Sequence, residues 1–192
     1  MPSAIVFDLE FTAWPGSMEH HWLRPGEFRE VVQIGAVKLD TGTLAETGSA
    51  DILAKPRLNP VLSPYFETLT GVTNARLARD GLDFAEAYRA FLSFAGDAPL
   101  VAFGRDDLVL IANLKLYGLN GEPPLPPHIN IVPWLRRAGI DTRGLHACDI
   151  AKAAGAAFEG RLHDALDDAR SVAEGIRALV ARGFANPFSE AA

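Results

Sequence analysis

Apolar and polar residues alternate over positions 4–11, and this pattern predicts a β-strand. Because successive side chains of a strand point to opposite faces, Asp8 and Glu10 would share one face. A nearly continuous apolar run at 31–39 predicts a second strand, and segment 47–54 predicts a third, weaker one. The first part of the chain is therefore expected to form a sheet.

The rest of the chain alternates short strand patterns with helical ones. Segment 83–94 carries apolar residues at helical spacing and begins with Asp83, a favourable N-cap residue. The other expected elements are strands at 99–103 and 129–132 and helices at 106–117, 146–154 and 164–181. Strands followed by alternating strands and helices predict an α/β fold, with a five-stranded mixed sheet flanked by helices.

Length and composition predict one globular domain. The chain has 192 residues, of which 48% are hydrophobic and 22% charged, and these proportions argue against a disordered protein. We expect a single domain over 1–183 and a short tail over 184–192. Apolar runs are too short to cross a membrane, no signal-peptide pattern is seen, and the lone Cys148 excludes an intramolecular disulfide. A cytoplasmic protein is therefore expected.

Two carboxylates, Asp8 and Glu10, are the first candidates for metal ligands. Burying two anions side by side on a sheet face is costly unless a cation neutralises them. Mg²⁺ prefers oxygen ligands and suits one or two carboxylates together with a substrate phosphate. The alternative is an edge strand whose polar face is solvated, but the apolar residues on both sides favour a central strand.

His163 and Asp168 lie at the start of the last predicted helix. Asp164 is a favourable N-cap residue, so we expect the helix to begin there and His163 to lie in the preceding loop. Asp168, in the first turn, would then share a site with His163, and the helix N-terminus would help to keep its carboxylate ionised. A surface histidine beside an acidic helix start is the alternative.

Two adjacent aspartates, Asp106 and Asp107, follow Gly104-Arg105 at the junction of a predicted strand and a predicted helix. Either aspartate would serve as the N-cap and the other as a ligand, so this pattern alone leaves both assignments open. An ordinary strand-to-helix turn explains the segment equally well.

Five segments together strongly resemble one known family. They are Phe-Asp-Leu-Glu-Phe-Thr at 7–12, Gln-Ile-Gly-Ala-Val at 33–37, Leu-Thr-Gly-Val-Thr at 69–73, the turn at 104–108, and His-x-Ala-Leu-Asp-Asp-Ala-Arg at 163–170. The family is that of the DEDDh-type, DnaQ-like 3′–5′ exonucleases, and the resemblance implies a ribonuclease H-like fold. The chain looks most similar to the branch of histone-mRNA exonucleases and bacterial sporulation-inhibitor-like proteins.

The resemblance implies a catalytic set at defined positions. The metal carboxylates of the family fall on Asp8, Glu10, Asp107 and Asp168, and its general base falls on His163. The resemblance implies Asp107 rather than Asp106, because the aspartate of the family stands three residues after a glycine, here Gly104. Two divalent ions, Mg²⁺ or Mn²⁺, would lie about 3.5–4 Å from each other and bind the scissile phosphate between them. His163 would accept the proton of the attacking water.

Such an enzyme would release nucleoside 5′-monophosphates from the 3′ end of single-stranded RNA or DNA. The alternative is a regulatory or binding protein of the same fold with weak nuclease activity. A net charge of −6 argues against a long basic groove, because phosphate neutralisation supplies much of nucleic-acid affinity. The charge is compatible with an exonuclease that holds only the last few nucleotides, or that acts on very short oligonucleotides.

Thr12 and Leu69 are the expected substrate contacts. Thr12 follows the metal strand and would offer its backbone or hydroxyl to the terminal nucleotide, and the resemblance implies that Leu69 packs against the last base. A helix-capping turn with Thr73 as the N-cap explains the segment 69–73 equally well. The long connection 14–29 would place its two tryptophans on bases and Arg24 or Arg29 on phosphates. Alternatively, these side chains only cap the core.

Overall fold

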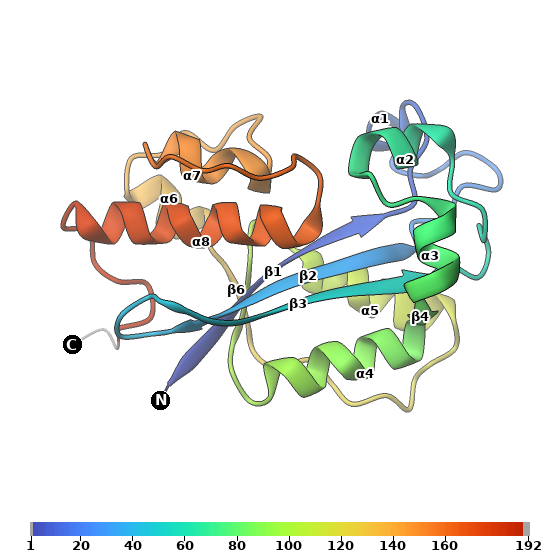
Figure 1. The fold of residues 1–192 in the computed structure, drawn as a ribbon, viewed down its shortest axis with the longest axis horizontal. Helices are drawn as coiled ribbons and strands as arrows, with labels where there is room; N and C mark the ends of the chain where they lie inside the picture. The colour runs from blue at the N-terminus through green and yellow to red at the C-terminus, as the bar shows by residue number, and fades with distance from the viewer. Residues whose placement is uncertain (1, 190–192) are drawn as a thin grey trace.

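In a computed structural model, which describes residues 2–189, six strands form one mixed sheet (Figure 1). The strands are β1 (Ser3–Phe11), β2 (Val31–Asp40), β3 (Glu46–Lys55), β4 (Leu82–Asp83), β5 (Leu100–Ala102) and β6 (His128–Asn130). Their order across the sheet is β4-β3-β2-β1-β5-β6. β1 pairs antiparallel with β2 and parallel with β5, so the strand that carries the candidate metal ligands is central.

The predicted mixed sheet is confirmed, but it has six strands rather than five. The additional strand, β4, is two residues long and pairs with the end of β3. Two residues cannot show a period-two pattern, and Asp83 also caps the following helix, so the sequence indicated only a helix there. The strand predicted at 129–132 lies at 128–130, because Val132 already begins a helix.

Helices cover both faces of the sheet (Figure 1). One apolar core lies between the sheet and three of them, and a second lies on the opposite face. The first face is covered by α6 (Val132–Arg137), α7 (Ile150–Ala153) and α8 (Ala165–Ala181), and the second by α4 (Phe84–Ala95) and α5 (Asp106–Leu116).

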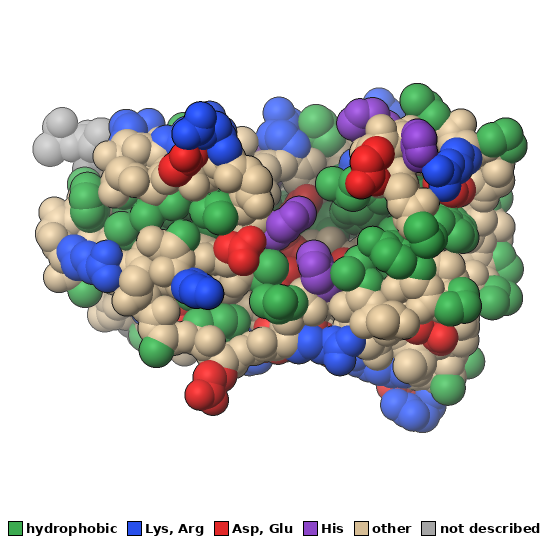
Figure 2. Space-filling view, turned by 90° about the horizontal axis from the view of Figure 1, so that it is seen from above, with side chains coloured by type: hydrophobic (Ala, Val, Ile, Leu, Met, Phe, Trp, Pro, Cys, Tyr) green, Lys and Arg blue, Asp and Glu red, His purple; other side chains and the backbone are tan. Residues whose placement is uncertain are grey.

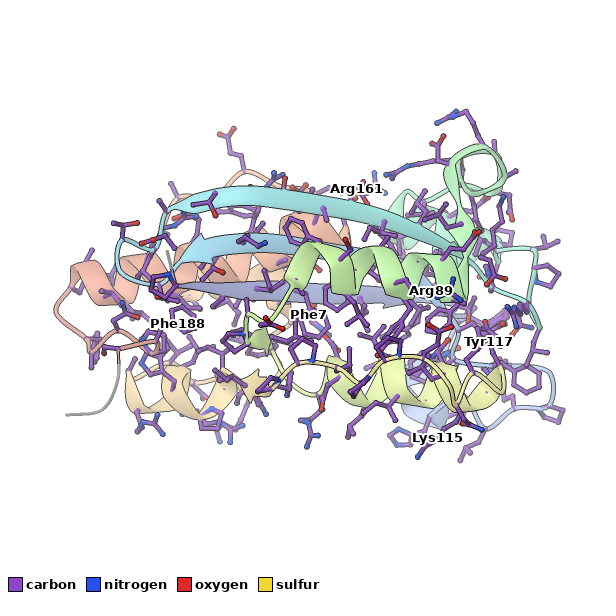
Figure 3. All side chains as sticks on the ribbon, turned by 90° about the horizontal axis from the view of Figure 1, so that it is seen from below. Phe7, Arg89, Lys115, Tyr117, Arg161 and Phe188 are labelled. Atoms are coloured by element: carbon purple, nitrogen blue, oxygen red, sulfur yellow. The ribbon has the colours of Figure 1, made fainter. Side chains whose placement is uncertain are left out.

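The alternation of β1 distributes its side chains between these two cores. Ala4 and Val6 pack on the α8 face. Phe7 points to the opposite face, where its ring centroid lies 5.3 Å from that of Phe91 on α4 (Figure 3). By the same alternation, Asp8 belongs to the α8 face, and Glu10 joins it two residues later.

Three short helices lie together at one end of the sheet (Figure 1). They are α1 (Ser17–His20), α2 (Pro64–Thr70) and α3 (Asn74–Asp80). Side-chain caps begin two of them, since Ser63 accepts a hydrogen bond from the Phe66 N–H and Thr73 accepts one from the Arg76 N–H. Helices of this length show too few turns for a clear apolar period, so the sequence did not predict them.

The helix expected at 146–154 consists of a 3₁₀ turn at Ala147–Asp149 followed by α7. The other predicted helices are found, with each end within one residue of its predicted position. Within the described part of the chain, no helix is both long and apolar enough to cross a membrane.

Candidate active site

A cavity of about 600 Å³ opens where β1 ends, bordered by α1, α2 and the start of α8. Figure 2 shows this hollow, with acidic and histidine side chains inside it and hydrophobic side chains along its border. Its acidic and histidine lining residues are Asp8, Glu10, Glu19, Asp106, His146, His163 and Asp168. The fold therefore gathers residues from the beginning, middle and end of the chain at one place.

Asp8 and Glu10 point into this cavity from the same face of β1. Burial raises the pKa of Asp8 well above its usual value, and the charges of Asp106, Glu10 and Asp168 raise it further. Burial and the neighbouring carboxylates, Asp168 first among them, likewise raise the pKa of Glu10. Like charges this close favour either protonation or a bound cation.

Asp168 extends from the first turn of α8 toward these strand carboxylates. Burial raises its pKa to about 7, with further contributions from the charges of Asp164 and Asp167. Its Oδ1 atom is buried and accepts no hydrogen bond from the described residues. Glu10, His163 and Asp168 each offer one ligand atom, and these three atoms lie within 4.8 Å of one another. An orphaned carboxylate oxygen in such a cluster fits a divalent cation.

The start of α8 is held against β2 by a close backbone contact. A Cβ atom on Gly35 would lie 2.0 Å from the carbonyl carbon of Ala165, so only glycine fits there. Gln33, fully buried, accepts a hydrogen bond from the Ala165 N–H at 3.2 Å and donates one to the Asp164 carboxylate at 3.2 Å. These contacts fix the position of α8 relative to the strand carboxylates.

His163 lies in the loop immediately before α8, as predicted. Asp164 caps the helix, since its carboxylate accepts hydrogen bonds from the Leu166 N–H at 3.1 Å and the Asp167 N–H at 3.2 Å. Burial lowers the pKa of His163, and the nearby His146 lowers it further. The two imidazole rings lie 5.8 Å apart, centroid to centroid.

Asp106, the first residue of α5, lines the cavity beside the strand carboxylates. Its charge raises the pKa values of both Asp8 and Glu10. Burial raises its own pKa to about 7, although the positive charge of Arg29 opposes that increase. Asp106 is therefore the fourth carboxylate of the cluster.

Asp107, the metal carboxylate implied by the resemblance, lies outside this cavity, and its role as a metal ligand stays a prediction. It borders a second cavity, on the far side of the first turn of α5, together with His128. Arg105 forms an ion pair with it at 2.8 Å, and this hydrogen-bonded partner lowers the pKa of Asp107. Successive helix residues point about 100° apart, so only one of two adjacent aspartates can face β1.

Thr12, the predicted substrate contact, has its polar groups engaged within the protein. The Thr12 hydroxyl donates a hydrogen bond to the Phe28 carbonyl and accepts one from the Glu30 N–H. Its backbone N–H donates to the Glu30 carbonyl at 2.8 Å, and its carbonyl accepts from the Trp22 indole at 2.7 Å. Thr12 thus anchors the connection 14–29, and its contact with the substrate stays a prediction.

Leu69 does line the cavity, from α2. Tyr65, one turn earlier on the same helix, lies beside it, and Trp14 and Trp22 of the connection 14–29 complete an aromatic border. This placement favours the hypothesis that the two tryptophans face a ligand over the hypothesis that they only cap the core.

Comparison with known proteins identifies the family. The model of the exonuclease family RNase_T matches residues 5–175. The chain belongs to this exonuclease family. Comparison with curated protein sequences gives no match. The predicted membership of the DEDDh-type, DnaQ-like exonucleases is confirmed, and with it the prediction of a nuclease enzyme.

Solved structures of exonucleases share the ribonuclease H-like fold. The nuclease domain of 3′hExo, a DEDDh family member bound to rAMP, superposes with a TM-score of 0.78 at 22% identity, over 94% of this chain and 92% of that one. Cell-death related nuclease 4 superposes with a TM-score of 0.73 at 21% identity, over 95% of this chain and 65% of that one. E. coli exonuclease I, in complex with a dA16 oligonucleotide, superposes with a TM-score of 0.67 at 14% identity, over 95% of this chain and 42% of that one.

The sequence alone did not assign Asp106 or His146 to this exonuclease's cavity. The local pattern left Asp106 and Asp107 both open as metal ligands, and the spacing of the family motif then implied Asp107. His146 precedes a short 3₁₀ turn, where nothing in the surrounding pattern distinguishes it from a surface histidine. Only the fold, which places residue 146 beside residue 163, reveals its position.

Proposed function

We propose that this exonuclease is metal-dependent and releases nucleoside 5′-monophosphates, one at a time, from the 3′ end of single-stranded RNA or DNA. The observation that carries the proposal is the meeting of Asp8, Glu10, Asp106, Asp168 and His163 in one cavity. Asp106 takes the role that the family spacing gave to its neighbour.

The carboxylate set suits two divalent ions, Mg²⁺ or Mn²⁺. Burial raises the pKa of each of the four carboxyl groups, so holding them as anions without a cation is costly. Asp8 would hold both ions, Glu10 and Asp168 the first, and Asp106 the second. Ions bound there would lower the pKa of a bound water and offset the charge of the scissile phosphate.

His163 is the proposed general base. Because burial and His146 lower its pKa from the usual 6.5, the imidazole is neutral at pH 7. A neutral ring nitrogen can accept the proton of the attacking water. The cap formed by Asp164 holds this loop residue at the edge of the carboxylate cluster.

Hydrophobic side chains of the cavity would hold the terminal base. Leu69, Tyr65, Trp14 and Trp22 present apolar and aromatic surfaces on which any base can stack. The bound rAMP of 3′hExo and the bound dA16 of E. coli exonuclease I support a nucleic-acid substrate for this fold and leave the choice of sugar open.

The test is degradation of 5′-labelled single-stranded RNA and DNA with Mg²⁺ or Mn²⁺, beside Asp8→Ala and His163→Ala. We expect a ladder that shortens from the 3′ end, is abolished by a chelator and falls about 100-fold or more in either variant. Binding without cleavage under either metal would instead support a regulatory or nucleic-acid-binding protein.

A further inference from the structure

Most arginines of this exonuclease are engaged by carboxylates of the protein itself. Nine of them lie within 4.0 Å of an Asp or Glu oxygen, as Arg57 does with Asp83 at 2.8 Å and Arg76 with Asp51 at 2.6 Å. Among the residues that the structure describes, no lysine or arginine lines the active-site cavity. Neutralised arginines do not form a continuous track for phosphates.

Arg29 is placed differently, beside the cavity. Its guanidinium carbon lies 4.0 Å from the centre of the Phe11 ring and 4.9 Å from the centre of the Trp22 ring, and both rings line the cavity. Its charge also acts on Asp106, whose pKa it lowers. Within the described part of the chain, Arg29 takes part in none of the ion pairs.

The backbone around Arg29 is fixed by buried polar side chains. Asn113 on α5 donates a hydrogen bond to the Arg29 carbonyl at 3.0 Å and accepts one from the Val31 N–H at 2.9 Å. The buried carboxylate of Glu30 accepts hydrogen bonds from three consecutive N–H groups at 57–59. A guanidinium stacked on two rings above a rigid backbone loses little further freedom when it binds a ligand.

We propose that Arg29 binds the backbone phosphate next to the scissile one and is the main cationic contact of this chain with nucleic acid. A planar guanidinium suits that role, because it donates two parallel hydrogen bonds to a phosphate. The footprint then covers only the last few nucleotides, and short oligonucleotides are hydrolysed as efficiently as long strands. This inference rests on the proposed exonuclease function.

The first test measures kcat/KM on strands of about 3, 7 and 20 nucleotides over a series of salt concentrations, at fixed saturating metal. We expect kcat/KM to change less than about threefold with length, and its logarithm to fall with log salt at a slope near −0.7, the value for one contact with a single strand. An increase of about 100-fold with length, or a slope of about −3 or steeper, overturns the inference while the exonuclease function stands.

The second test compares Arg29→Gln with wild type on a trinucleotide and on the p-nitrophenyl ester of thymidine 5′-monophosphate, which lacks the neighbouring phosphate. We expect KM for the trinucleotide to rise about tenfold, the loss of one charge-assisted hydrogen bond, with kcat nearly unchanged. Hydrolysis of the ester at saturating metal should change much less than hydrolysis of the trinucleotide, because the ester has no neighbouring phosphate and the variant loses there only the Arg29 charge that acts on Asp106. Arg29→Lys recovers part of the affinity, because it keeps the charge without the planar donor pair.

Arg79→Gln is the matched control, since its guanidinium is exposed and bonded to the adjacent Asp80. It should leave all rates unchanged. Equal losses in Arg29→Gln on the ester and the trinucleotide would show that Arg29 does not recognise a neighbouring phosphate. If the wild type hydrolyses neither the ester nor any strand, the exonuclease function fails, and this inference fails with it.

Discussion

His163 adopts a left-handed backbone conformation, with φ of 58°, which is unfavourable for residues other than glycine. Strain of this kind persists where the surrounding structure holds it, and here Asp164 caps α8 immediately afterwards. The turn directs the imidazole toward Glu10 and Asp168 instead of along the helix. At the scale of single residues, the proposed base is therefore positioned by a local conformation that residue spacing alone does not specify.

The pH dependence of cleavage should report the protonation of His163. At saturating metal, the single-turnover rate should rise as the imidazole loses its proton, with a midpoint below the usual 6.5, because burial and His146 both lower its pKa. His146→Ala removes one of these two causes, so the midpoint should move to higher pH. A midpoint that stays in place in this variant would show that His146 does not act on the base.

The strands and the longest helix were predictable because their patterns are local. Alternation over β1 placed Asp8 and Glu10 on one face, and a cap residue marked the start of α8. The rotation of α5 about its axis was not predictable from motif spacing. That rotation is set by packing of its buried Val109 and Leu110 in the α4–α5 core, and it turns the first aspartate rather than the second toward β1.

Gly35→Ala should disrupt the contact between β2 and α8. The added Cβ atom would lie 2.0 Å from backbone atoms of Ala165 and Leu166, which cannot move without shifting the helix. We expect the free energy of unfolding to fall by about 3 kcal/mol, measured by chemical denaturation. Gly121→Ala, where no atom lies within 4 Å of an added Cβ, should leave stability nearly unchanged. Equal stability of both variants would contradict the close approach.

For the molecule as a whole, the carboxylate cluster makes stability depend on pH and on metal. Asp106 and Asp168 have pKa values of about 7 in the folded protein, against the usual 3.8. A carboxyl whose folded pKa is raised stabilises the protein fully below the unfolded pKa and loses that contribution as pH rises through the folded one. The metal-free protein should therefore lose stability between about pH 4 and pH 8.

Thermal unfolding with and without Mg²⁺ or Mn²⁺ checks this expectation. The Tm in chelator should fall as pH rises through that window, and the gain from added metal should be larger at the alkaline end, where the carboxylates are ionised. Asp168→Asn should raise the metal-free Tm at the alkaline end and reduce the gain from metal. A metal-free Tm that rises with pH across this window would contradict the raised pKa values of Asp106 and Asp168.

The most direct test of the proposed active site compares Asp106→Asn with Asp107→Asn in single-turnover cleavage of a 5′-labelled strand at saturating Mn²⁺. We expect Asp106→Asn to lower the rate about 100-fold or more, since it removes a proposed metal ligand. Asp107→Asn, which affects the ion pair with Arg105, the contact with His128 and the second cavity, should keep the rate within about threefold of wild type, with both variants folded by thermal unfolding. The opposite result, with Asp107 essential and Asp106 dispensable, would contradict this assignment.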